Sequence, residues 1–255
     1  MRVLGVDLAA QPASTGVVVL EPDGRGRWVA AAAADEATDE MLVELGAAAD
    51  KVGVDAPLGW PEPFVVAVSA HLDHRPWPGT QDRRSLTHRR TDDVVVEHGW
   101  GRPMSASADR LGSVAMRAAL LQREWALRWG APAPRDGSGR LAEVYPAAAL
   151  RAWGIESVGY KASGARAAAA PGVRAGIVAA LRNACGGWLD LDGVAEAVVV
   201  SDHLLDALLS ALVAVAVTQG ATLGPRDDEE RRLAAIEGWI HVPVVALGEL
   251  AAPVR

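Results

Sequence analysis

The chain of 255 residues has a single cysteine and no long uninterrupted apolar run, and each shortage excludes a class of protein. Because Cys185 stands alone, the chain can form neither an intramolecular disulfide nor a zinc site built on several thiolates. The longest apolar stretch, residues 204–217, is interrupted by Asp206 and is too short to cross a bilayer. The N-terminus has no cleavable signal pattern. We therefore expect a soluble protein of the cytoplasm with no membrane partner.

Lysine is also scarce. Lys51 and Lys161 are the only lysines among 25 basic residues, and the formal net charge is −7. A chain with this charge does not bind nucleic acid through its overall field, so any polyanion has to be bound by a local patch. Apolar residues, in contrast, make up 50% of the chain. This content is enough to bury a large core, and we expect one domain over residues 1–255.

The hydrophobic pattern predicts an α/β protein that begins with an antiparallel hairpin, because two apolar, β-branched runs flank a small-residue turn. Helical spacing, capping residues and prolines predict the later elements. The predicted strands are residues 2–10, 15–20, 27–32, 51–55 and 141–146, and the predicted helices are residues 36–49, 65–72, 111–129, 147–153, 173–185 and 202–219. Periodicity weakens over residues 60–110, which we interpret as an insertion of loops and a short helix after the fourth strand.

Carboxylates recur where apolar elements end. Magnesium and manganese are hard cations that prefer oxygen ligands, so carboxylates from separate elements suit them. Two such ions about 3.5–4 Å apart can activate a water and stabilise the leaving oxygen in phosphodiester hydrolysis. The candidates are Asp7 in the first strand, Asp55 in the fourth, Glu143 in the fifth, and Asp202 and Asp206, which are four residues apart on one face of the last apolar helix.

Each of these carboxylates also has a structural interpretation. Asp7 can be the polar end of a strand, and Asp55 can bond the backbone of the turn that follows it. Glu143 can pair with an arginine, and Asp202 can cap its helix. Asp206 lies inside an apolar helix, where an unpaired charge is costly to bury, and this position favours a functional role.

Four arginines crowd the predicted insertion: Arg83, Arg84, Arg89 and Arg90. A guanidinium forms forked hydrogen bonds to phosphate, so these arginines are candidates for binding a nucleic acid beside an acidic site. Trp77 and Trp100 are candidates for stacking on its bases. The alternative is a solvated loop in which the arginines pair with nearby aspartates.

Several motifs together resemble a known family, the domain-of-unknown-function 429 family of predicted nucleases in the ribonuclease H-like superfamily. The resemblance implies a five-stranded mixed sheet of order 3-2-1-4-5 flanked by helices. It also implies a divalent-metal phosphodiesterase site. The matching stretches are Gly5-Val6-Asp7-Leu8-Ala9, Val54-Asp55-Ala56-Pro57-Leu58-Gly59, Arg89-Arg90-Thr91-Asp92, Glu143-Val144-Tyr145-Pro146, Asp202-His203-Leu204-Leu205-Asp206-Ala207 and Glu237-Gly238-Trp239-Ile240.

On the pattern of that superfamily, Asp7, Asp55 and either Asp202 or Asp206 bind Mg²⁺ or Mn²⁺, and Glu143 is an additional acid that orients the attacking water. We therefore expect a metal-dependent nuclease with a nucleic-acid partner. Two alternatives stay open: an actin-like nucleotide-binding phosphotransferase or ATPase, which shares the strand order, and a non-catalytic binding protein with a relict site. The sequence does not indicate the oligomeric state, or whether the substrate is RNA or DNA.

Overall fold

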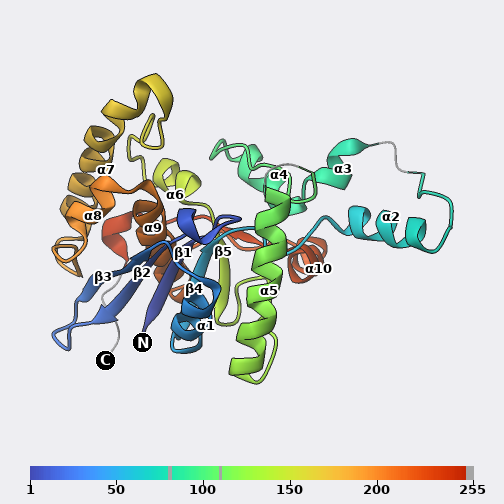
Figure 1. Ribbon diagram of the computed structural model, residues 1–255, viewed down its shortest axis with the longest axis horizontal. Coiled ribbons are helices and arrows are strands. Elements are labelled where there is room, and N and C mark those ends of the chain that lie inside the picture. Colours follow the sequence, from blue (N-terminus) through green and yellow to red (C-terminus); the bar gives the residue numbers. More distant parts are fainter. Residues whose placement is uncertain (80–81, 109–110, 251–255) are drawn as a thin grey trace.

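A seven-stranded sheet runs through the centre of the computed structural model, which describes residues 1–79, 82–108 and 111–250 (Figure 1). Its strands lie in the order β6-β3-β2-β1-β4-β5-β7. Strand β1 pairs antiparallel with β2 and parallel with β4, so the sheet is mixed. The strands are β1 (Val3–Asp7), β2 (Gly16–Pro22), β3 (Trp28–Asp35), β4 (Lys51–Asp55), β5 (Leu141–Val144), β6 (Leu189–Asp190) and β7 (Ile240–His241).

The expected mixed α/β class is confirmed, but five strands is too few. The two additional strands, β6 and β7, are two residues long and extend the two edges of the sheet. Each pairs in parallel with its neighbour, β6 with β3 and β7 with β5. Two residues cannot show an alternating apolar pattern, which explains why the hydrophobic periodicity did not predict these strands.

Helices flank the sheet and fill the segment between β4 and β5. They are α1 (Asp39–Ala47), α2 (Glu62–Leu72), α3 (Arg83–Thr87), α4 (Arg90–Glu97), α5 (Leu111–Trp129), α6 (Pro146–Ala152), α7 (Ala170–Cys185), α8 (Ala195–Val200), α9 (Asp202–Thr218) and α10 (Asp228–Glu237). Helix α5 has the predicted bounds. Thr38 is the N-cap of α1, and its hydroxyl accepts a hydrogen bond from the Met41 amide at 3.3 Å.

The two faces of the sheet carry different helices (Figure 1). On one face Val3 and Trp28 pack with residues of α7, α8 and α9. On the opposite face Leu4 and Val6 pack with residues of α1 and α5. Since successive side chains of a strand point to opposite faces, Asp7 lies on the same side as Val3 and faces α9.

Two glycines let α9 lie unusually close to the sheet. A Cβ at Gly5 of β1 would collide with the carbonyl oxygen of Ala207, and one at Gly53 of β4 would collide with that of Ser210. The two glycines are directly opposite each other in the parallel β1–β4 register. Each is followed two residues later, on the same face, by an aspartate. The repeated Gly-Val-Asp sequence therefore brings the start of α9 against the ends of both strands.

The predicted insertion at residues 60–110 contains α2, α3 and α4, and its residues 80, 81, 109 and 110 lie outside the described residues. Figure 1 shows α2 extending away from the sheet, whereas α4 contacts the edge strand β7. Within the described part of the chain, no helix combines the length and the apolar character needed to cross a membrane.

Candidate functional site

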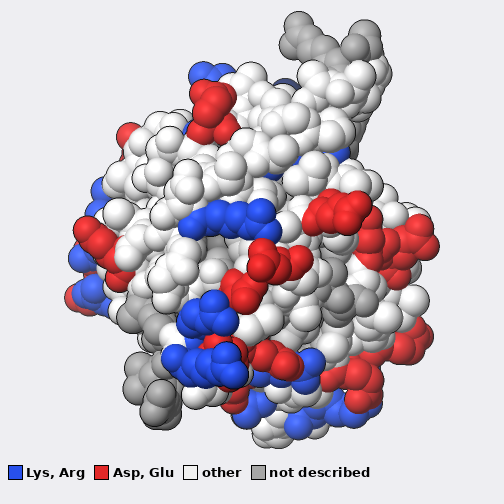
Figure 2. All heavy atoms as spheres, turned by 90° about the vertical axis from the view of Figure 1, so that its left-hand side faces the viewer, with Lys and Arg blue, Asp and Glu red and all other residues white. Residues whose placement is uncertain are grey.

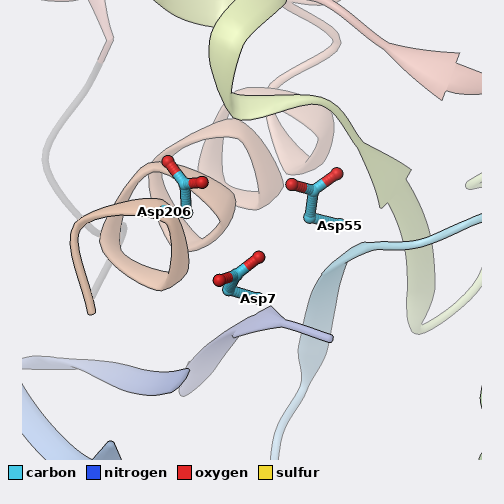
Figure 3. A group of neighbouring side chains, drawn as sticks. All are labelled: Asp7, Asp55 and Asp206. Carbon is cyan, nitrogen blue, oxygen red and sulfur yellow. The ribbon is translucent and has the colours of Figure 1, made fainter. Parts of the chain in front are cut away.

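Three aspartates meet where β1 and β4 end and α9 begins. Asp7 and Asp55 are paired in the parallel register of the two strands. Asp206 projects toward them from the second turn of α9 (Figure 3). One carboxylate oxygen of each residue lies within 4.8 Å of the others. We call Asp7, Asp55 and Asp206 the acid cluster.

The acid cluster is largely buried. Asp206 is fully buried, Asp7 is 9% exposed and Asp55 is half-buried. Burial raises the pKa of Asp206 to about 7, although the neighbouring Lys161 partly offsets the effect. Burial also raises the pKa of Asp55 well above its ordinary value; Lys161 opposes this shift, and the negative charges of Asp7 and Asp206 add to it. Three carboxylates this close therefore need more positive charge to ionise fully near neutral pH.

Three side chains contact the acid cluster. The Lys161 ammonium forms an ion pair with Oδ2 of Asp206, and the Tyr160 hydroxyl donates to Oδ1 of Asp206 at 3.0 Å. His203 Nδ1 lies 2.8 Å from Oδ2 of Asp7, and this hydrogen bond raises the pKa of His203. Each oxygen of Asp206 therefore has a partner within the protein, the Lys161 ammonium at Oδ2 and the Tyr160 hydroxyl at Oδ1.

The donor set fits Mg²⁺ or Mn²⁺. All three groups are carboxylates, and hard divalent cations select such oxygens. In an octahedron with magnesium–oxygen distances of about 2.0–2.1 Å, neighbouring oxygens lie about 3 Å apart. The three carboxylate oxygens lie within 4.8 Å of one another, so sharing one ion would require them to move closer together.

A cavity of about 370 Å³ opens beside the acid cluster. Asp7, Asp55 and Lys161 lie in its wall, and Met104 and Tyr145 add apolar and aromatic surface. This volume is at the lower end of the range of about 300–1,000 Å³ for small-molecule sites. The cavity can therefore place one small polar ligand against the acids.

The other two predicted acids are not part of the acid cluster. Asp202 is half-buried in the first turn of α9, where Ser201, and not Asp202, caps the helix. Glu143 is bound at both oxygens by Arg89, at 2.6 and 2.7 Å, and also accepts a hydrogen bond from the Leu58 amide at 2.9 Å. Glu143 also lies in the wall of the cavity, where these hydrogen bonds hold it in place.

Arg89 is buried and lies in the wall of the cavity. It is 2% exposed and bridges Glu143 and Asp92, whose Oδ1 accepts from it at 2.9 Å. Burial would lower the pKa of Arg89, but the two carboxylates raise it above its ordinary value. We call Arg89, Asp92 and Glu143 the Arg89 cluster. It ties the start of α4 to β5, and so holds the insertion on the sheet.

The remaining predicted phosphate ligands lie on the insertion surface. Arg90 pairs with Glu97 and Glu230, at 2.6 and 3.0 Å, and Arg84 pairs with Asp93. Arg83 is exposed. None of these three arginines is in the wall of the cavity beside the acid cluster. They correspond more closely to the alternative of a solvated, internally paired surface.

The two tryptophans predicted to stack on bases have protein neighbours. Trp100 is stacked on His98, with ring centroids 4.5 Å apart, and Trp77 meets His71 edge-on at 6.1 Å. Neither tryptophan is in the wall of the cavity. Tyr145, which follows the end of β5, is the aromatic residue placed there instead.

The sequence did not predict the partners of the acid cluster. Tyr160 and Lys161 lie in a turn with no periodicity, and nothing in the local sequence shows that this turn reaches α9. His203 had a signal: it lies in the first turn of the apolar helix, between Asp202 and Asp206 in the sequence. The most useful signal was the repeated Gly-Val-Asp of β1 and β4, which marks the surface that α9 contacts.

Comparison with known proteins gives one match. A family model described as "Protein of unknown function (DUF429)" matches residues 5–231, a range that contains the acid cluster, Lys161 and His203. No curated protein and no solved structure matches the chain. The family description assigns no activity, so any functional conclusion has to start from the geometry of the site.

Proposed function

The chain belongs to the DUF429 family, and we propose that it is a divalent-metal-dependent nuclease of the ribonuclease H-like type. One observation carries this proposal: three carboxylates from separate elements converge within 4.8 Å in a largely buried site. Burying three like charges without compensation is costly, and such arrangements concentrate at functional sites. A divalent cation supplies the missing charge.

The strand order supports the ribonuclease H-like part of the proposal. The five interior strands lie in the order β3-β2-β1-β4-β5, which is the order that the resemblance implies. The acids Asp7 and Asp55 end the two central strands, and Asp206 comes from the long helix packed on them. Fold alone does not identify a reaction, so the argument for hydrolysis rests on the site.

The residues of the site have separate roles in this proposal. Asp7, Asp55 and Asp206 would hold Mg²⁺ or Mn²⁺, which would supply an activated water and stabilise the leaving oxygen of a phosphodiester. His203 and Tyr160 contact Asp7 and Asp206 and fix the orientation of these carboxylates.

The charge distribution supports a locally bound nucleic acid. On the face drawn in Figure 2, basic and acidic residues are interspersed among uncharged ones. The net charge of −7 also disfavours binding through a broad basic surface. We propose that one nucleotide of the substrate enters the cavity beside the acid cluster, where Tyr145 can contact its base and Lys161 its phosphate.

The test is cleavage of RNA, DNA, hybrid and branched substrates by the purified protein with Mn²⁺, compared with Asp7→Asn. Losing a metal ligand removes several kcal/mol of transition-state stabilisation, so we expect at least about a thousand-fold loss of cleavage. The matched control is Asp202→Asn, which removes the same charge from the first turn of α9 outside the acid cluster and should change the rate little.

Equal cleavage by the wild-type protein and Asp7→Asn would contradict the proposal. The alternatives make different predictions for the same preparations. A nucleotide-binding phosphotransferase would be stabilised against heat by ATP. A binding protein with a relict site would retain Mn²⁺ affinity but cleave none of the substrates.

A further inference from the structure

The contact between Lys161 and Asp206 places a protein cation where the proposed metal has to bind. We infer that the Lys161 ammonium and the divalent cation compete for Asp206, and that the displaced ammonium becomes the ligand of a substrate phosphate. This inference rests on the proposed function and assigns a role to a residue outside the acid cluster.

Lys161 and the proposed metal would share one oxygen. The ammonium of Lys161 lies against the buried Oδ2 of Asp206. An ion bound by all three carboxylates needs an oxygen of Asp206, and Oδ1 already accepts from Tyr160. A divalent ion and an ammonium this close together repel each other strongly in a site with little water. Entry of the ion therefore favours departure of the lysine.

Lys161 is able to move away from Asp206. Asp206 is fully buried, whereas the Lys161 side chain is 46% exposed, so the lysine reaches the acid from the surface. It lies in the turn at residues 158–161 rather than within a helix or strand. A lysine has a long flexible stem and three rotatable donors, and can change partner without a change in the fold.

The Lys161 ammonium has space into which it can move. Lys161 lies in the wall of the cavity beside the acid cluster and also of a neighbouring groove of about 660 Å³. Arg151 and the side chains of Ser157 and Ser163 belong to that groove. A phosphate next to the metal-bound one would meet Lys161 and Arg151 there. The cation released from Asp206 would thus contribute to holding the substrate.

Competition between Lys161 and the metal can be distinguished from a purely structural role of Lys161, because the two predict opposite changes in Mn²⁺ binding when Lys161 is removed. If Lys161 only held the Asp206 carboxylate in position, its removal would let that carboxylate move and weaken Mn²⁺ binding. If the two cations compete, its removal tightens Mn²⁺ binding, because no ammonium has to be displaced. The direction of the change therefore separates the two roles without any measurement of activity.

The experiment is a Mn²⁺ titration, followed by electron paramagnetic resonance at fixed neutral pH and without nucleic acid. The variants are Lys161→Met, the neutral polar Lys161→Gln, and Lys161→Arg as the control that keeps the charge. We expect at least tenfold tighter Mn²⁺ binding by the two neutral variants and no tightening by Lys161→Arg. The neutral variants should also cleave substrate at least tenfold more slowly, because they lack the phosphate ligand.

Circular dichroism confirms that each variant is folded, and either neutral variant is sufficient if the other does not fold. Unchanged or weaker Mn²⁺ binding by a folded neutral variant overturns the competition while leaving the nuclease proposal intact. If neither the wild-type protein nor the variants bind Mn²⁺, the metal site and the competition fail together.

Discussion

Two groups of buried charge lie beside the same cavity and differ in how their carboxylates are neutralised. In the Arg89 cluster, one guanidinium bridges two carboxylates through four side-chain hydrogen bonds of 2.6–3.2 Å. In the acid cluster, three carboxylates share one partly exposed lysine, one tyrosine and one histidine. The first arrangement is complete within the protein, whereas the second is not.

The difference separates structure from function among residues of the same type. A fully bonded buried ion pair needs no ligand and fixes the position of the elements that it joins. A crowded, incompletely neutralised set of acids costs stability, and it persists where a ligand supplies the missing charge. Glu143 and Asp206 are both buried acids, but the cation on Glu143 is a buried arginine, whereas the cation on Asp206 is a lysine whose side chain is 46% exposed.

The largest stability change is expected from breaking the complete cluster. Arg89→Met leaves Asp92 and Glu143 buried without their cation, which should lower the free energy of unfolding by about 3–5 kcal/mol. Urea denaturation measures the change. The control is Arg84→Met, which breaks the exposed pair with Asp93 and should cost no more than about 1 kcal/mol. If the two substitutions lowered the free energy of unfolding equally, the buried ion pairs of Arg89 would be no more important for stability than the exposed pair of Arg84.

His241 is a buried side chain whose hydrogen bonds are complete in its uncharged form. Its Nε2 lies 3.1 Å from the Asp136 carbonyl oxygen and its Nδ1 2.9 Å from the Thr222 hydroxyl, so both nitrogens are bonded in the neutral ring. Burial lowers the pKa of His241 to about 4, and the positive charge of Lys51 contributes.

Between about pH 6.5 and 4 the unfolded chain therefore binds a proton that the native chain does not. The folded state loses stability as pH falls through this window, by up to about 3 kcal/mol. His241→Gln should lack this part of the pH dependence, which denaturation curves at several pH values can measure. An identical pH dependence in both proteins would show that His241 is not held neutral.

The smallest effect has the opposite sign and lies in the acid cluster. Asp55→Asn removes one of three crowded charges, so in EDTA at pH 7.5 it should raise the free energy of unfolding by about 1 kcal/mol. Thermal denaturation measures the gain, with Asp202→Asn as the control. Mn²⁺ should then stabilise the wild-type protein and not Asp55→Asn. A metal-free Asp55→Asn protein less stable than the wild type would mean that the acids are already compensated.

Most of the central fold could be predicted because the signals were local. The bounds of α5 follow from helical spacing. The helix predicted over residues 36–49 is α1, which begins later, after its N-cap Thr38. The edge strands β6 and β7 could not be predicted, because a strand of two residues exists only through its neighbour.

The candidate site was predictable only in part. Asp7, Asp55 and Asp206 could be proposed from their positions at the ends of apolar elements. The sequence could not rank Glu143 and Arg89 as structural, because 54 residues separate these two partners. The contact between Lys161 and Asp206 was not predicted for the same reason, because these two residues are far apart in the chain. Pairings over such distances are set by packing, not by local pattern.

The most direct test of the central claim is a crystal of the protein soaked in Mn²⁺ and measured for anomalous scattering. We predict a peak within bonding distance of oxygens from Asp7, Asp55 and Asp206, with the Lys161 ammonium moved away from Asp206. Crystals that take up Mn²⁺ at other positions, but show no peak among these three carboxylates, would contradict the account.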